Sequence, residues 1–140
     1  MTTHAKLRQG TTAWFEMVGT LMSEAASQSG LAPDLNVSLV ERYTDGVEIS
    51  ECLVQGLRFD LCNGTPSFRV GVRRDERADI TIEITAAAAR AVNLLYDADP
   101  QYLDVLDKLL STGEMRVDGD ALRLGGWLKI VHDPIVDRTI

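Results

Sequence analysis

The hydrophobic period of the sequence changes twice along the chain, and these changes limit the folds that the chain can adopt. Residues 12–27 place apolar side chains at helical spacing, residues 35–84 contain five runs of alternating apolar and polar side chains, and helical spacing returns after Ile84. A period of about 3.6 residues predicts an amphipathic helix, and alternation predicts a half-buried strand. We therefore expect one helix, a group of strands, and a second group of helices.

The first part of this order has clear boundaries. Thr11 or Thr12 can cap a helix over residues 12–27, because a hydroxyl oxygen accepts a hydrogen bond from a free backbone N–H of the first turn. Gly30 and Pro33 are typical of the chain just beyond a helix end. Five half-buried strands of an antiparallel sheet are expected next, over residues 35–40, 47–53, 57–62, 68–73 and 79–84.

The apolar pattern also predicts how the first two strands pair. A three-residue turn at residues 44–46 would pair Tyr43 with Val47 and put the apolar side chains of both strands on one face. In that register Glu41 and Glu51 are diagonal neighbours on this face. Two carboxylates in an apolar pocket repel, and burial raises the pKa of at least one, as in a general acid or base. The alternative is that either carboxylate reaches solvent or pairs with an arginine.

Three helices and one more strand are expected after the fifth strand. The helices begin at Ala86 and Pro100, with a last one ending before Pro134, and a short strand covers residues 114–117. Asp99 can cap the second of these helices, and proline suits its first position. The element order is α-β-β-β-β-β-α-α-β-α, which is the α+β class, and 140 residues are the length of a single domain.

Composition excludes several classes of function. The net charge is −7 and the arginines of residues 73–77 are mixed with acidic residues, whereas nucleic-acid binders carry basic patches. No apolar run approaches about 18 residues, so we expect no integral membrane span. No apolar stretch opens the chain, so we expect no signal peptide and a cytoplasmic location. His4 and His132 are far apart and the cysteines lack paired spacing, so we expect no metal, and no cofactor motif is present.

From Ala78 onward the sequence resembles the sterol carrier protein 2 domain. The resemblance is carried by the strand at residues 78–82, the helix that begins at Thr85, and the helix start at residues 99–100. In that family a Gly-x-Leu-x-Ile-x-Gly-Asp stretch precedes the last helix. Residues 113–120 read Gly-Glu-Met-Arg-Val-Asp-Gly-Asp, with methionine and valine in place of leucine and isoleucine. The earlier residues agree with the family only in the order of their elements.

The resemblance implies a mostly antiparallel five-stranded sheet, covered on one face by helices, that encloses an apolar tunnel. It also implies non-covalent binding and transport of a sterol, a fatty acyl chain or a similar lipid. We therefore interpret residues 1–140 as a single sterol-carrier-like domain that carries a hydrophobic small molecule. The side chains expected to bind this ligand are Trp14, Val18, Val37, Leu39, Ile49, Phe59, Ile82, Leu103, Leu106, Met115, Trp127 and Leu128.

Two alternatives remain open. A small enzyme would use the same pocket for acid/base chemistry on an apolar substrate, with Glu41 and Glu51 as its candidate catalytic residues. A partner-binding module would present the helix at residues 100–110, or the last helix, to a second copy of the chain or to a partner enzyme. An apolar lining suits a packed core and a hollow cavity equally, so the sequence leaves this choice to the structure.

Overall fold

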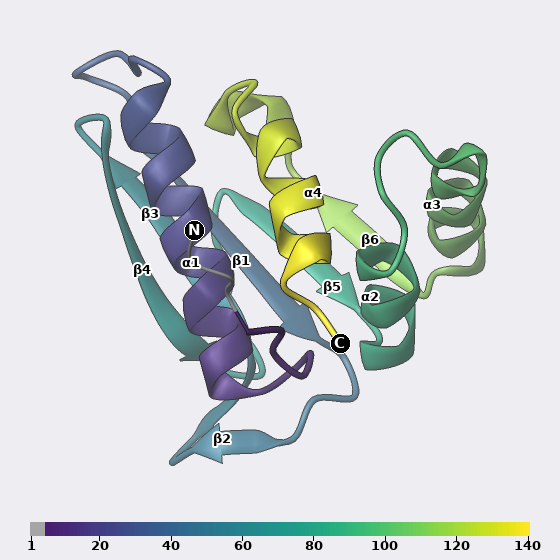
Figure 1. Ribbon diagram of the computed structural model, residues 1–140. Coiled ribbons are helices and arrows are strands. Elements are labelled where there is room, and N and C mark those ends of the chain that lie inside the picture. The colour runs from purple at the N-terminus through teal and green to yellow at the C-terminus, as the bar shows by residue number, and fades with distance from the viewer. Residues whose placement is uncertain (1–4) are drawn as a thin grey trace.

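The computed structural model describes residues 5–140 and has helices packed on one face of a sheet (Figure 1). Residues 1–4, which include His4 and most of the N-terminal stretch on which the expectation of no signal peptide rests, lie outside the described residues. The helices are α1 (Thr12–Gln28), α2 (Ala86–Asn93), α3 (Pro100–Thr112), the short 3-10 helix η1 (Ala121–Leu124) and α4 (Leu128–Asp137). The strands are β1 (Val37–Tyr43), β2 (Glu48–Ser50), β3 (Leu53–Cys62), β4 (Thr65–Val72), β5 (Ile80–Ile84) and β6 (Met115–Asp118). This order confirms the predicted α+β class.

The helices begin at the residues that the sequence marks as caps. The Thr11 hydroxyl accepts a hydrogen bond of 3.2 Å from the backbone N–H of Trp14 at the start of α1. Thr85 and Asp99 cap α2 and α3 in the same way. Each cap satisfies a backbone donor that has no partner within its own helix. Gly113 ends α3 with a φ of 81°, a left-handed conformation that glycine adopts without strain.

The sheet is mostly antiparallel, as expected, but within residues 5–140 it has six strands instead of five. β1 lies between β3 and β5, β4 flanks the far side of β3, β6 flanks β5, and the short β2 pairs with the start of β3. β1 and β5 run parallel, and the other pairs are antiparallel. The additional strand arises because β6, close to the C-terminus, joins the same sheet as the five earlier strands.

The predicted pairing of the first two strands is wrong. β1 pairs with β3, so that Glu41 lies opposite Leu57, and β2 forms a separate small hairpin with β3. The residues after β1 are held by the β5–α2 junction instead. The Thr44 N–H donates to the carbonyl of Ile84 at 2.9 Å, and the Asp45 carboxylate accepts the N–H at the start of α2 at 2.8 Å. A hydrophobic pattern specifies the face of the sheet on which a side chain lies, but it does not specify which strand pairs with which.

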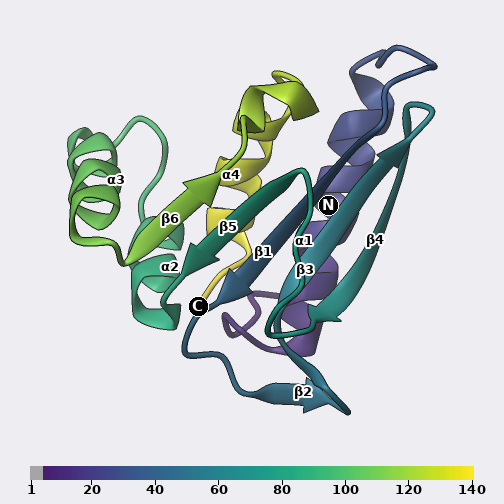
Figure 2. The ribbon, with the colours of Figure 1, turned by 180° about the vertical axis from the view of Figure 1, so that it is seen from behind.

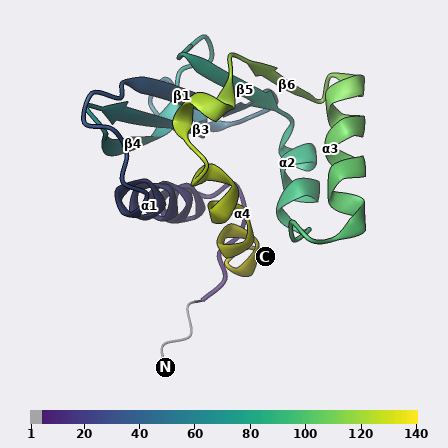
Figure 3. The same ribbon diagram turned by 90° about the horizontal axis from the view of Figure 1, so that it is seen from above.

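The helices are arranged in two groups over the sheet (Figure 3). α1 packs against β3 and β4, and α4 lies beside α1. α2 and α3 pack together near the β6 edge. The buried core between the helices and the sheet includes Trp14, Phe15, Met22, Val37, Leu39, Phe59, Ile80, Leu124 and Trp127.

α1 approaches the sheet closely at Gly19, which faces the Phe68 ring on β4. A Cβ atom at position 19 would lie 2.4 Å from Cδ2 of Phe68, far inside van der Waals contact. We expect Gly19→Ala to lower the free energy of unfolding by about 1–3 kcal/mol through overpacking, although alanine is intrinsically favoured in helices by about 1 kcal/mol. Urea denaturation measures this change. Gly126→Ala is the matched control, since a Cβ atom there meets open space, and a more stable Gly19→Ala variant would contradict the close approach.

The opposite face of the sheet is crossed by residues 73–79, which connect β4 to β5 (Figure 2). This crossover packs on a second buried cluster formed by Val40, Val54 and Val72, with Ala78 against it. Its backbone is anchored by Arg42 of β1, whose guanidinium donates to the carbonyl of Glu76 at 2.8 Å. The crossover places β5 beside β1 in the parallel direction.

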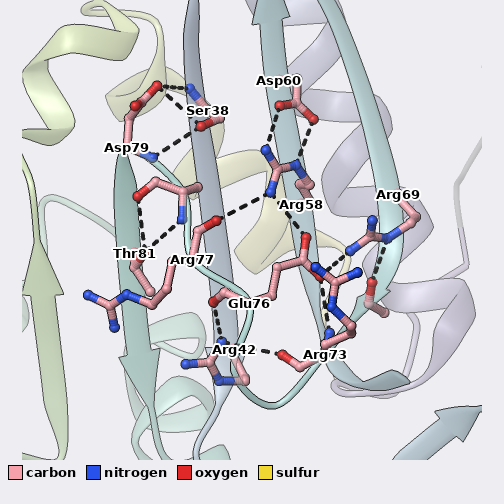
Figure 4. A network of polar contacts seen from close by, with 12 residues as sticks. Ser38, Arg42, Arg58, Asp60, Arg69, Arg73, Glu76, Arg77, Asp79 and Thr81 are labelled. Carbon is pink, nitrogen blue, oxygen red and sulfur yellow. Dashed lines mark hydrogen bonds and ion pairs between the residues drawn. The ribbon is translucent and has the colours of Figure 1, made fainter. Parts of the chain in front are cut away.

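The Glu76 side chain connects the crossover to Arg58 of β3 and Arg69 of β4 (Figure 4). This carboxylate is only 2 % exposed and accepts hydrogen bonds from the guanidinium groups of Arg58 and Arg69 and from the backbone N–H of Arg73. Burial alone would raise the pKa of Glu76, but these three donors outweigh it and lower the pKa below its usual value. Glu76 is therefore a fully partnered carboxylate.

Candidate ligand-binding cavity

A cavity of about 500 Å³ lies between the helices and one half of the sheet. β1, β5 and β6 form its floor, and residues from α1, α2, α3 and α4 form its walls. Figure 3 shows α4 and the α2–α3 pair on the same side of these strands. Its apolar lining consists of Val18, Met22, Leu39, Ile82, Ile84, Ala89, Val92, Leu103, Leu106, Met115, Leu128, Val131 and Ile135. The space is thus lined mainly by apolar side chains.

Most polar groups of the lining come from the walls. Asp97 and Lys129 are exposed and carry opposite charges. His132 lies with a ring nitrogen 2.7 Å from the carbonyl of Leu95, and its ring packs against Tyr102 at a centroid distance of 4.7 Å. Burial, followed by nearby aspartate charges, raises the pKa of the Tyr102 phenol. The walls therefore offer a small set of oriented polar groups near solvent.

Glu41 is the charged group on the cavity floor. It belongs to β1 in the interior of the sheet, between Leu57 of β3 and Ile82 of β5. Desolvation by burial raises the pKa of its carboxyl group, and no partner in residues 5–140 offsets that effect. The side chain is half-buried, and it lines the cavity. The Glu41 carboxylate is therefore available to interact with a ligand in the cavity.

The cavity brings together seven of the twelve residues expected to bind a ligand. They come from α1, β1, β5, α3, β6 and the start of α4. They are Val18, Leu39, Ile82, Leu103, Leu106, Met115 and Leu128. Their contact with a ligand stays a prediction.

The other five lie elsewhere in the structure. Trp14 and Val37 are buried in the core. Trp127 packs against Phe59 at a centroid distance of 5.4 Å, and its indole N–H donates to a backbone carbonyl of η1 at 2.7 Å. Ile49 lines a separate, more open depression beside α1 and β4. These side chains fill space or face another surface, so they do not shape the cavity.

Sequence reasoning missed several apolar residues of the cavity lining, although the spacing of some of them contained a signal. Val131 and Ile135 follow Leu128 at intervals of three and four, which is one stripe of α4. Ile84 continues the alternation of β5. The remaining missed apolar residues are Met22, Ala89 and Val92.

The predicted pair of glutamates is not formed. Glu51 lies exposed in the turn between β2 and β3, whereas Glu41 faces the cavity. The prediction was wrong because it rested on pairing β1 with β2, and β2 pairs with β3 instead. In the described part of the chain no three His, Cys, Asp or Glu side chains are grouped to hold a metal ion. Within the same residues no helix is long and apolar enough to cross a membrane.

Comparison with known proteins identifies the fold. No family model matches the sequence, and no curated protein does. The structure is similar to a crystal structure of sterol carrier protein 2, with a TM-score of 0.56 and 16% identity over 94% of this chain and 98% of the other. The chain has a sterol carrier protein 2-like fold. This confirms the resemblance seen from Ala78 onward and extends it to the first half of the chain.

Two further structures are similar to this sterol carrier protein 2-like fold. One is the ubiquinone synthesis protein UbiJ-SCP2, with a TM-score of 0.48 and 15% identity over 89% of each chain. The other is sterol carrier protein domain 2 of Helicoverpa armigera, with a TM-score of 0.44 and 11% identity over 97% of each chain.

Proposed function

We propose that this chain binds a hydrophobic small molecule, such as a sterol or an acyl lipid, in the cavity and carries it without a covalent step. The cavity is the observation that supports this proposal. Its volume of about 500 Å³ lies within the range of about 300–1,000 Å³ that is common for small-molecule sites. Thirteen of its lining residues are apolar and six are polar. Such sites bind through apolar contact and orient the ligand through a few polar groups.

The binding energy would come mainly from apolar surface that leaves water. This contribution is about 25 cal/mol for each Å² buried, before the cost of association is subtracted. The similar structure with a TM-score of 0.56 is named as a sterol carrier, and the similarity covers 94% of this chain. Sterols and acyl chains have the long apolar bodies that the lining suits.

The proposal is tested by native mass spectrometry of freshly purified protein, followed by organic extraction and identification of the released molecule. A co-purified lipid at one equivalent per chain is the expected result. Protein that is empty, and that also leaves the fluorescence of an added lipid probe unchanged, would reject the proposal.

Filling the cavity should abolish binding. Ile82 lies on the floor, so the larger indole of Ile82→Trp would occupy the ligand's space. We expect the affinity for a fluorescent lipid to fall by at least about tenfold, which corresponds to about 1.4 kcal/mol. Ile130→Trp is the matched control, because Ile130 is 70% exposed and lies outside the lining.

Circular dichroism checks that both tryptophan variants fold. If Ile82→Trp is unfolded, Leu106→Trp fills the same space from α3. A folded filling variant that binds the lipid as tightly as Ile130→Trp would place the binding site outside the cavity.

A further inference from the structure

The fold gives no structural reason for a carboxylate at position 41. The residues on either side of Glu41 in the sheet, Leu57 and Ile82, are apolar. Leu39, two positions earlier on the same face, is buried in the core. Burying an ionised carboxylate without a partner is unfavourable, because the group loses its hydration. An apolar or amide side chain at this position would fit the fold at lower cost.

Glu76 is a buried carboxylate with a structural role, and its surroundings differ from those of Glu41. Three hydrogen-bond donors surround Glu76 and lower its pKa. The Glu41 carboxylate has no such donor among residues 5–140, and burial raises its pKa. The difference between the two sites is that Glu41 lines a cavity large enough to admit a ligand.

The other titratable groups that line the cavity do not neutralise Glu41. Lys129 is exposed and forms no ion pair with Glu41 within the described chain, and Asp97 on the same cavity lining carries the opposite charge. His132 is engaged with a backbone carbonyl, and Tyr102 packs against its ring. The floor of the cavity therefore presents a carboxylate that no described residue of this chain neutralises.

We infer that the ligand carries a hydrogen-bond donor, either a hydroxyl or a protonated amine, at the end of its apolar body that reaches Glu41. This inference rests on the proposed binding function and names the ligand class. A ligand with a carboxylate at that end would be repelled by Glu41 whenever this glutamate is ionised. A fatty acid in the reverse orientation would cover Glu41 with its tail and leave the glutamate without water or a partner. The cavity thus selects against fatty acids.

The test uses dodecylamine, dodecanol and dodecanoate, which share one chain and differ in the head group. Their dissociation constants are measured at pH 7 by displacement of an uncharged fluorescent lipid. The wild-type protein should bind the alcohol and the amine about tenfold more tightly than dodecanoate, since hydrogen bonds to charged groups are strong. Glu41→Gln should remove most of this preference. Glu51→Gln is the matched control, because it makes the same change in net charge at an exposed position.

Each outcome decides between the inference and its alternatives. Equal affinities for the three ligands, or an unchanged order in Glu41→Gln, would overturn the inference and leave the proposed function standing. A preference lost equally in Glu51→Gln would also overturn it, because overall charge would then be the cause. If none of the three ligands binds any variant and the fluorescent lipid does not bind either, the proposed function itself fails.

A measurement without ligand adds an independent check. Glu41→Gln should not lower the melting temperature of the empty protein, because it removes a partly desolvated carboxylate that no described residue stabilises. A clear drop would mean that Glu41 has a structural partner, and that result would also overturn the inference.

Discussion

Replacing Phe59 with alanine should lower the free energy of unfolding by about 3–5 kcal/mol, as is usual for deletion of a buried aromatic ring. The Phe59 ring is fully buried at the centre of the sheet. Its backbone neighbours are Leu39 on β1 and Phe68 on β4, and its ring packs against Trp127 just before α4. The ring thus joins three strands to the C-terminal helical segment, and its loss would leave a cavity that the neighbours cannot close.

Ile82→Ala provides the comparison, with urea denaturation of the ligand-free protein as the measurement. Ile82 is half-buried and faces the existing cavity, so its side chain has fewer packed neighbours to lose. Its deletion should cost less than deletion of Phe59, below about 2 kcal/mol. If the alanine variant of Ile82 were the less stable one, the assignment of packed core and hollow cavity would be reversed.

The sequence alone did not distinguish residues of the packed core from residues that line the cavity. Alternation on β1, β3 and β5 correctly predicted which side chains face the helices, because the period of a strand is a local property. It did not separate Phe59, which is packed, from Ile82, which lines a cavity. Both positions require an apolar side chain. The difference depends on where α4 lies relative to α2 and α3, and that is set by contacts distant in sequence.

Helix starts were predictable because they depend on local contacts, whereas strand partners depend on contacts distant in sequence. Thr11 and Asp99 were predicted as caps because a cap bonds to a residue two or three positions away. The partners of β1 were not predicted, since its turn residues bond to a segment about 40 positions further along the chain, Ile84 and Ala86.

Pro134 was expected to end the last helix, but α4 continues to Asp137. Proline removes one backbone hydrogen bond, to the carbonyl four residues earlier. That carbonyl belongs to Ile130, whose residue is 70% exposed. At this exposed position the helix continues to Asp137 with that one hydrogen bond missing.

Of the two glutamates, the pattern placed only Glu41 correctly on the cavity side. Glu41 interrupts the apolar alternation of β1 between Leu39 and Tyr43, both buried. This is a local signal that a polar side chain faces an apolar space. Glu51 lies in a turn, where alternation no longer specifies a face.

Replacing Glu76 with alanine should lower the free energy of unfolding by about 2–4 kcal/mol, because it leaves buried donors without their acceptor. The loss falls short of that for a fully buried ion pair, since the side chains of Arg58 and Arg69 are 26% and 44% exposed. Glu76→Gln retains the shape and part of the hydrogen bonding, so it should cost less. Asp60→Asn is the control. It removes another partner of Arg58 at a site with 35% exposure, where the change should stay below about 1 kcal/mol.

The stability that Glu76 provides should depend on pH in a defined direction. Its pKa is lowered in the folded protein from an ordinary value of 4.5, so the folded state holds the proton less tightly than the unfolded chain. The contribution is then complete above pH 4.5 and is lost as the pH falls through the folded pKa. The difference in unfolding free energy between the wild-type protein and Glu76→Gln should be largest near neutral pH and shrink on acidification. A difference that stayed constant down to about pH 3 would mean that apolar packing on Val40, Val54 and Val72 holds the crossover, and that the ionised carboxylate does not.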